Sequence, residues 1–142
     1  MCVSYISLVI TTKLNNNMKT IVETPNAPSP IGPYSQAVLS GSTLYTSGQI
    51  AIDPKTGELV MATFEEETHQ VMTNMRAVLA EAGMTFDHVI KTSIFISDMD
   101  NFSDINSVYA QYFTSDFPAR ETVEVARLPK DVNVEISMIA VK

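Results

Sequence analysis

The sequence predicts an α+β fold, in which a single mixed β-sheet has two helices packed on one of its faces. The first observation is the order of the expected elements, which runs strand-strand, helix, strand, helix, strand-strand. The second is the composition: 45% of the 142 residues are hydrophobic and 18% are charged, which is typical of one globular domain with its own core. A sheet covered on one side leaves its other face free, and this favours association of several copies through that face.

The N-terminal segment stands apart from this fold. Residues 1–17 begin with an apolar stretch, MCVSYISLVI, that is far shorter than the roughly 20 residues of a membrane helix, so no membrane association is expected. The stretch also lacks the positive start and the cleavage site of a signal peptide, although a weak export signal stays an alternative. We predict that residues 1–17 are a disordered extension or reflect a start codon assigned too early, and that residues 18–142 form a single domain.

The first part of the domain is expected to be a loop followed by two strands. Residues 24–36 carry four prolines and a glycine, which favour an extended loop over a helix or strand. Residues 42–52 are rich in β-forming side chains and predict a strand with a glycine inside it. The turn sequence DPKTGE then leads to a short apolar segment, residues 59–61, which predicts a second strand.

The clearest helix begins after Thr63. Thr63 and Glu66 have the spacing of a capping box, and Glu65 and Glu67 lie in the first turn, where the helix dipole favours negative charge. Gly83 ends the helical pattern. The apolar side chains that recur at helical spacing are Val71, Met72, Met75, Val78, Leu79 and Ala82.

Four further elements complete the chain. Residues 88–97 predict a buried strand, and residues 101–113 predict a second helix with one aromatic and aliphatic face. Two alternating segments, residues 121–128 and 132–141, predict the last strands, which meet at Pro129-Lys130.

These last strands are interpreted as a hairpin with Pro129-Lys130 as its loop, although a third strand between them stays an alternative. In a hairpin, opposed residues share a face of the sheet. One face would then collect apolar residues, namely Val123, Val125, Val134, Ile136 and Met138. The other face would collect polar residues, namely Arg120, Thr122, Glu124, Asn133, Glu135 and Ser137.

Arg120 and Glu135 are the strongest candidates for chemistry on that polar face. Arginine presents a planar fork that suits a carboxylate ligand, and Pro118 stiffens the approach to Arg120. A glutamate that is near this arginine but not bound to it can hold or deprotonate a water molecule. The alternative is an ordinary surface ion pair, which is the commoner arrangement of such residues on one sheet face.

Three other residues invite a functional reading, each with a structural alternative. Gly48 interrupts a predicted strand and marks either a β-bulge or a close approach of the backbone to a ligand. Tyr34 lies in the proline-rich loop and is either a binding or a packing residue. Asn106 lies inside a helix, where asparagine is mildly unfavourable, and is either functional or simply exposed. No metal is expected, because neither His69 nor His88 has a second ligand at metal spacing.

The charge and the cysteine content of the chain limit its possible partners and its cellular location. The chain has 16 acidic and 9 basic residues, a net charge of −7, and no segment rich in Lys and Arg. Nucleic acid is therefore not an expected partner, because phosphate binding requires a basic surface. The single cysteine, Cys2, excludes an internal disulfide and predicts a reducing, cytoplasmic location.

The stretches APSPIGPYSQAV, YTSGQIAIDPKTGEL, VIKTSIFISDMDNF, NSVYAQYF and FPARETVEVARLPKDVNVEI match a known family as a set. Together they resemble the Rid family, the YjgF-type reactive intermediate deaminases, from about Ile21 to the C-terminus. The resemblance implies a chorismate-mutase-like fold and a homotrimer with ligand sites between subunits. It also implies hydrolysis of enamine and imine intermediates, such as 2-aminoacrylate and 2-iminobutanoate, to 2-keto acids and ammonia, without a cofactor.

The resemblance also implies roles for single residues. Arg120 would bind the substrate carboxylate, and Glu135 would orient the attacking water. The residues implied to line the cleft are Tyr34, Ser47, Gly48, Asn106 and Thr122. Three positions depart from the family pattern. Thr122 stands where many relatives carry cysteine, Ser137 replaces a common glutamate, and Glu121 adds a negative charge beside Arg120. These departures leave substrate preference open.

Other functions remain open beside the imine deaminase. The main alternative is a protein that binds or senses small 2-keto or amino acids on the same fold without catalysis. Both functions need Arg120, whereas only catalysis needs a water placed by Glu135. An RNA-directed role, described for some relatives of the family, is disfavoured by the acidic composition. A chaperone-like role depends on how much apolar surface stays exposed.

Overall fold

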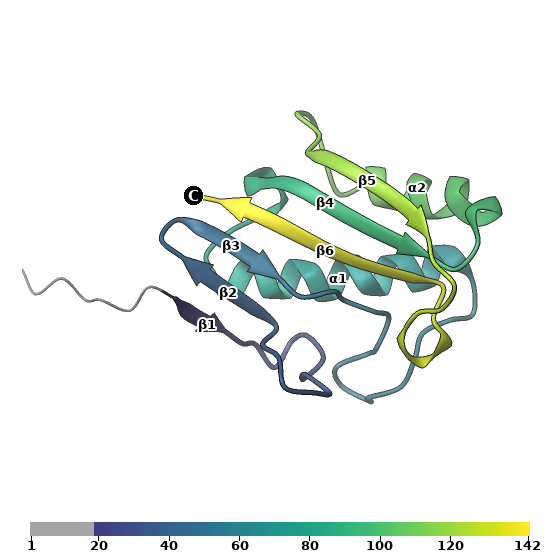
Figure 1. Cartoon of the computed structure of the whole chain (residues 1–142), viewed down its shortest axis with the longest axis horizontal. Coiled ribbons are helices and arrows are strands. Elements are labelled where there is room, and N and C mark those ends of the chain that lie inside the picture. The colour runs from purple at the N-terminus through teal and green to yellow at the C-terminus, as the bar shows by residue number, and fades with distance from the viewer. Residues whose placement is uncertain (1–18) are drawn as a thin grey trace, which may run out of the picture.

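A computed structural model describes residues 19–142 of the chain, so the extension predicted over residues 1–17 lies outside the described residues. Six strands form one sheet in the order β1-β2-β3-β6-β4-β5, and helices α1 (Phe64–Glu81) and α2 (Phe102–Ala110) both cover the same face (Figure 1). The strands are β1 Thr20–Val22, β2 Ala37–Ser40, β3 Thr43–Thr46, β4 Val89–Ile96, β5 Ala119–Glu124 and β6 Val134–Val141. Short 3₁₀ turns span Phe86–His88, Met99–Asn101 and Pro129–Asp131. The predicted α+β class, with one mixed sheet and two helices on one face, is confirmed.

The hairpin predicted for the last two strands is wrong, because β4 lies between β5 and β6. Helix α2 connects β4 to β5, which run parallel, as a helical crossover between neighbouring parallel strands allows. Strand β6 then returns on the other side of β4 and pairs antiparallel with it. The alternation of apolar and polar residues shows which face of the sheet each residue of a strand lies on, but it does not show which strand lies beside it. The pattern therefore fitted a hairpin of β5 and β6 as well as the observed order with β4 between them.

The N-terminal part of the sheet differs from the prediction as well. The strand expected over residues 42–52 is shorter, and β3 ends at Thr46, two residues before Gly48. Its hairpin partner is β2, across a turn in which Gly41 has φ +60°. The strand expected over residues 59–61 is reduced to a single bridge between Ile52 and Leu59. Strands β1 and β2 were not predicted, since three or four residues beside a proline-rich loop carry little periodicity.

Helix α1 has the ends that the sequence predicts. The Thr63 side chain accepts a hydrogen bond from the Glu66 N–H at 3.1 Å and thereby caps the first turn. At the other end Gly83 has φ +69°, and the N–H groups of Gly83 and Met84 donate to the carbonyls of Ala80 and Leu79. Only a residue that tolerates a left-handed conformation closes the helix in this way.

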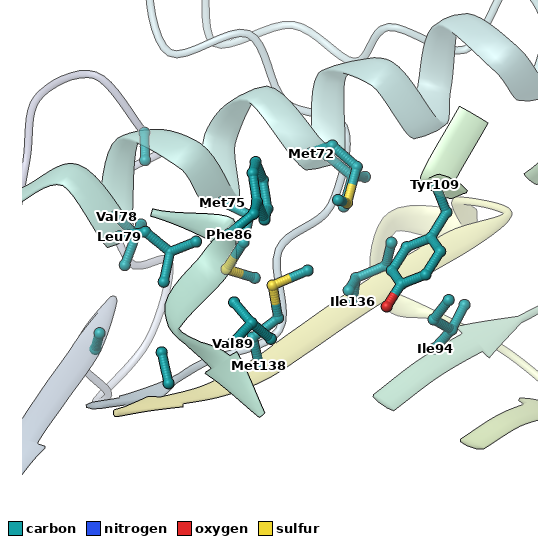
Figure 2. Packing of buried hydrophobic residues seen from close by; sticks show 14 of the residues in the cluster. Met72, Met75, Val78, Leu79, Phe86, Val89, Ile94, Tyr109, Ile136 and Met138 are labelled. Atoms are coloured by element: carbon teal, nitrogen blue, oxygen red, sulfur yellow. The ribbon is translucent and has the colours of Figure 1, made fainter. Parts of the chain in front are cut away.

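The main core lies between the sheet and the two helices (Figure 2). The methionines of α1 pack against Ile136 and Met138 of β6 and Ile94 of β4, all of which are buried. Tyr109 of α2 also enters this layer, and its hydroxyl donates to Thr92 Oγ1 at 3.1 Å. This packing holds α2 against β4 and β5, where the first group of candidate site residues lies.

The opposite face of the sheet has no helix over it (Figure 1). Cross-strand pairs place Ile21, Val38, Tyr45 and Ile139 together on this open face, and Ile21 and Tyr45 are about half exposed. A smaller cluster of buried residues at one end consists of Ile50, Ile52, Leu128 and Val132. Within residues 19–142, neither helix is long and apolar enough to cross a membrane.

Candidate functional site

Arg120 is the second residue of β5, at the edge of the sheet, and it points to the face that the helices cover. Its Nη1 atom donates to Asn106 Oδ1 of α2 at 2.8 Å. Its guanidinium carbon lies 5.0 Å from the ring centre of Tyr109 and 5.6 Å from that of Phe102. Contacts of this kind orient a guanidinium by cation–π attraction without neutralising its charge. Asn106 is therefore a partner of Arg120 and not merely an exposed residue.

No carboxylate of residues 19–142 lies within ion-pair distance of Arg120; the two ion pairs of this part of the chain are Lys91–Glu121 and Arg127–Asp131. The charge of Glu121, next in sequence, is engaged on the open face by Lys91 and Ser93. These hydrogen bonds hold the pKa of the Glu121 carboxyl below its usual range. The negative charge of Glu121, although next to Arg120 in the sequence, therefore leaves the Arg120 guanidinium free to bind an external carboxylate.

The guanidinium of Arg120 opens into a cavity of about 410 Å³. The cavity is lined by Asn106, Tyr109, Ala110, Phe117, Pro118 and Arg120. Thr122, two residues further along β5, shares this face, and its Oγ1 is buried without a hydrogen-bond partner in the described part of the chain. The chemistry of this group of residues is that of an anion site with apolar walls.

Glu135 lies on β6, between two core residues, and points to the open face. Its side chain is partly buried and makes no hydrogen bond to any residue from 19 to 142. Burial alone raises the pKa of this carboxyl. A second cavity, of about 320 Å³, is lined by Ile31, Tyr34, Ser47, Gly48, Ile50, Pro129 and Glu135. A carboxylate that is partly dehydrated and unpaired is a suitable acceptor for a proton from water.

Gly48 makes room for this carboxylate. A Cβ atom at position 48 would lie 1.9 Å from Glu135 Oε1 and 2.8 Å from its Cγ, so any larger residue would displace the glutamate side chain. The Glu135 side chain thus explains the glycine at position 48, and the approach of the Gly48 backbone to a ligand stays a prediction.

The loop that carries Tyr34 is fixed beside Gly48 by hydrogen bonds. The buried Gln36 side chain accepts from the Thr24 N–H at 2.7 Å and donates to the carbonyls of Thr24, Ala27 and Pro28. Ser47 Oγ donates to the Ser35 carbonyl at 2.6 Å. Gln36 was missed by the sequence reasoning. The available signal was a glutamine within a proline-rich segment, whose carbonyl groups need donors other than a regular backbone ladder.

Within one copy of the chain, Arg120 and Glu135 lie on opposite faces of the sheet. Arg120 is aligned through Thr92 with Met138, whereas Glu135 is aligned through Phe95 with Val123. The shared polar face of the predicted hairpin is therefore wrong, because the intervening β4 changes which residues share a face. The structure instead forms two groups, Arg120 with Asn106 and Thr122, and Glu135 with Tyr34, Ser47 and Gly48. No group of three or more His, Cys, Asp or Glu side chains in residues 19–142 is arranged to hold a metal ion.

Known proteins share this chain's sequence and fold over nearly its whole described length. A RutC family protein of Pyrococcus horikoshii is 51% identical over 125 residues, which are 88% of this chain and 99% of that protein. The human 2-iminobutanoate/2-iminopropanoate deaminase is 43% identical over 129 residues, 91% of this chain and 94% of that enzyme. The crystal structure of YyfA, a Rid family protein of unknown function from Yersinia pestis, superimposes with a TM-score of 0.85 at 53% identity, covering 87% and 99% of the two chains.

The family model that describes endoribonuclease L-PSP matches residues 24–142, which include both groups of candidate site residues. With the relatives above, this match shows that the chain belongs to the Rid family.

Proposed function

We propose that this protein is a hydrolytic deaminase that converts enamine and imine intermediates, such as 2-aminoacrylate and 2-iminobutanoate, to 2-keto acids and ammonia. The observation that carries the proposal is the Arg120 guanidinium, which is oriented by Asn106 and two aromatic rings but has no carboxylate partner within residues 19–142. Such a group is suited to a small substrate carboxylate. The name of the human relative, a 2-iminobutanoate/2-iminopropanoate deaminase, supports the same substrate class. The single cysteine, Cys2, supports a cytoplasmic location.

The complete site would form between two copies of the chain in a homotrimer with a chorismate-mutase-like arrangement. Within one copy the sheet separates Arg120 from Glu135, so a single chain does not offer both groups to one small substrate. The open face, with its exposed Ile21 and Tyr45, supports association of copies. Arg120, Asn106 and Thr122 of one copy would then face Glu135, Tyr34, Ser47 and Gly48 of the next.

The reaction requires little more than positioning. Arg120 holds the carboxylate of the substrate, so that the carbon of the protonated imine lies at the carboxylate of Glu135. Glu135 accepts a proton from water as the water oxygen bonds to the imine carbon, which gives a tetrahedral amino alcohol. Glu135 returns that proton to nitrogen, and the C–N bond breaks as ammonia leaves. The hydroxyl group gives its own proton to Glu135 as the C=O bond of the 2-keto acid forms, and ammonia takes up this proton as ammonium. An enamine substrate first takes up a proton on carbon to become the imine.

The direct test generates 2-iminobutanoate with a threonine dehydratase and traps the remaining imine with semicarbazide. The wild-type protein is expected to lower semicarbazone formation in proportion to its concentration, because it removes the imine before the trap reacts. If the imine persists while 2-oxobutanoate still binds and the binding needs Arg120, the protein is a sensor of 2-keto acids and not a deaminase.

The rate is expected to depend on pH through Glu135. Because burial raises the pKa of this carboxyl, the proton-accepting form is lost as the pH falls through a value above the ordinary 4.5 of glutamate. After subtraction of uncatalysed hydrolysis, kcat/KM should fall toward low pH, with the midpoint of the fall above pH 4.5. The Glu135→Gln variant should lack this fall. A fall that persists in the variant would assign it to another group.

A further inference from the structure

One side of helix α1 carries polar side chains that are buried as completely as its apolar ones. Glu67 and Asn74 are both 0% exposed and lie about two turns apart, on the same side of the helix. Gln70 lies between them and donates to Asn74 Oδ1 at 2.9 Å. A buried polar side chain is costly unless its hydrogen bonds are made, so the partners of these residues indicate their purpose.

Glu67 binds the start of β6. Its Oε1 accepts from the backbone N–H groups of Asn133 at 2.7 Å and Val134 at 3.3 Å, and its Oε2 accepts from Asn133 Nδ2 at 2.8 Å. The sequence placed Glu67 in the first turn of the helix and explained it by the helix dipole alone. The structure shows instead that this carboxylate fixes the two residues that immediately precede Glu135.

Asn74 binds the chain segment that follows Gly48. Its Nδ2 donates to the carbonyls of Ile50 at 3.1 Å and Ile52 at 2.9 Å. Between the two anchored segments, Gln49 and Ile136 exchange backbone hydrogen bonds at 2.8 and 3.1 Å. The backbone on each side of the Gly48–Glu135 contact is therefore tied to the same helix.

We propose that Glu67 is a positioning residue for Glu135, and this inference rests on the proposed deaminase function. No side chain of residues 19–142 hydrogen-bonds the Glu135 carboxylate, so its place depends on the backbone of β6 and on the space at Gly48. Glu67 sets that backbone through Asn133 and Val134. Arg120 lies on a different strand, β5, to which Glu67 makes no hydrogen bond in the described part of the chain. Loss of Glu67 should thus impair the chemical step more than binding of the substrate carboxylate.

The test compares Glu67→Leu, which removes every acceptor, with Glu67→Gln, which keeps an oxygen for the backbone N–H groups. Imine hydrolysis is measured well below the thermal midpoint of each variant. Glu67→Leu is expected to lower kcat by about 10-fold or more with little change in KM, and Glu67→Gln to restore most of it. Glu66→Leu, an exposed neighbour on the same helix, serves as the control and should retain wild-type kcat. An equal loss of activity in Glu67→Leu and Glu67→Gln, or an unchanged kcat in Glu67→Leu, would overturn the proposal.

Asn133→Ala removes the contact to Oε2, together with the hydrogen bond from Ser97 Oγ to Asn133 Oδ1, and is used where Glu67→Leu does not fold. It is expected to lower kcat a few-fold at unchanged KM, and an unchanged kcat would overturn the proposal. Amide hydrogen exchange gives a readout that does not need activity. Exchange in residues 133–136 should accelerate in the folded variant while α2 stays unchanged, and uniform protection would contradict the anchoring role. If the wild-type protein does not hydrolyse the imine, the deaminase function itself is refuted. The anchoring role of Glu67 would then be refuted only if amide hydrogen exchange is the same in the variant and in the wild type.

Discussion

Replacing Arg120 with alanine is expected to lower kcat/KM for 2-iminobutanoate by about 10²- to 10³-fold, since a desolvated charge pair contributes about 3 to 4 kcal/mol. The guanidinium has no carboxylate partner within the described residues, so its removal would break no ion pair there. The residue is exposed at the edge of the sheet, and the variant should therefore fold. The semicarbazide assay gives the rate, and a thermal melt shows that the fold is kept.

Two further variants make this result specific. Arg127→Ala is the matched control, because Arg127 is an exposed arginine that pairs with Asp131 and lines neither cavity, and it should retain wild-type activity. Arg120→Lys keeps the charge but loses the planar fork, and an intermediate rate is expected. If Arg120→Ala hydrolyses the imine as fast as the wild type, the substrate carboxylate is bound elsewhere and the proposed site is wrong.

The sequence predicted those elements whose signals lie within one segment. Helix α1 could be predicted because Thr63, Gly83 and the apolar spacing between them all act locally. Strand β4 could be predicted because its eight residues, which pair with a strand on each side, form a largely apolar segment. The neighbours of β5 and β6 could not be predicted, because strand pairing is decided by packing between distant segments. The short strands β1 and β2 were missed because three or four residues carry little periodicity.

The candidate site was also predicted only in part, because the sequence indicated its residue types but not their arrangement. The residue types at Arg120 and Glu135 pointed to carboxylate binding and proton transfer, and both side chains line cavities. Their separation onto two faces could not be predicted, because it follows from β4 lying between their strands. Glu67 was explained by the helix dipole, since nothing in the sequence relates residue 67 to residue 133. Supporting residues of this kind need the fold before they can be recognised.

The separation of Arg120 and Glu135 onto opposite faces of the sheet leads to the prediction with the most distinctive outcome. The Arg120→Ala and Glu135→Gln variants should each be nearly inactive alone. The activity of Glu135→Gln should be lower than that of the wild type by about 10²-fold, because this variant lacks the proton acceptor. If every site takes Arg120 from one copy and Glu135 from the next, hybrids of the two variants regain intact sites. In a trimer that contains both variants, one of the three sites has both side chains, so about a third of the sites in the hybrids are intact. Co-expression with two different tags and purification on both would isolate the hybrids.

Such recovery cannot come from a site within one chain, because every copy in the hybrid lacks one of the two groups. Hybrids of Arg120→Ala with the double variant Arg120→Ala/Glu135→Gln are the matched control and should stay inactive, since no copy supplies the arginine. Activity near a third of the wild-type value in the purified hybrids would place the two groups of site residues on different copies. Doubly tagged hybrids no more active than their parents would show that Arg120 and Glu135 do not meet across an interface. The separation of the two residues by the sheet would then require a reaction that uses only one of them.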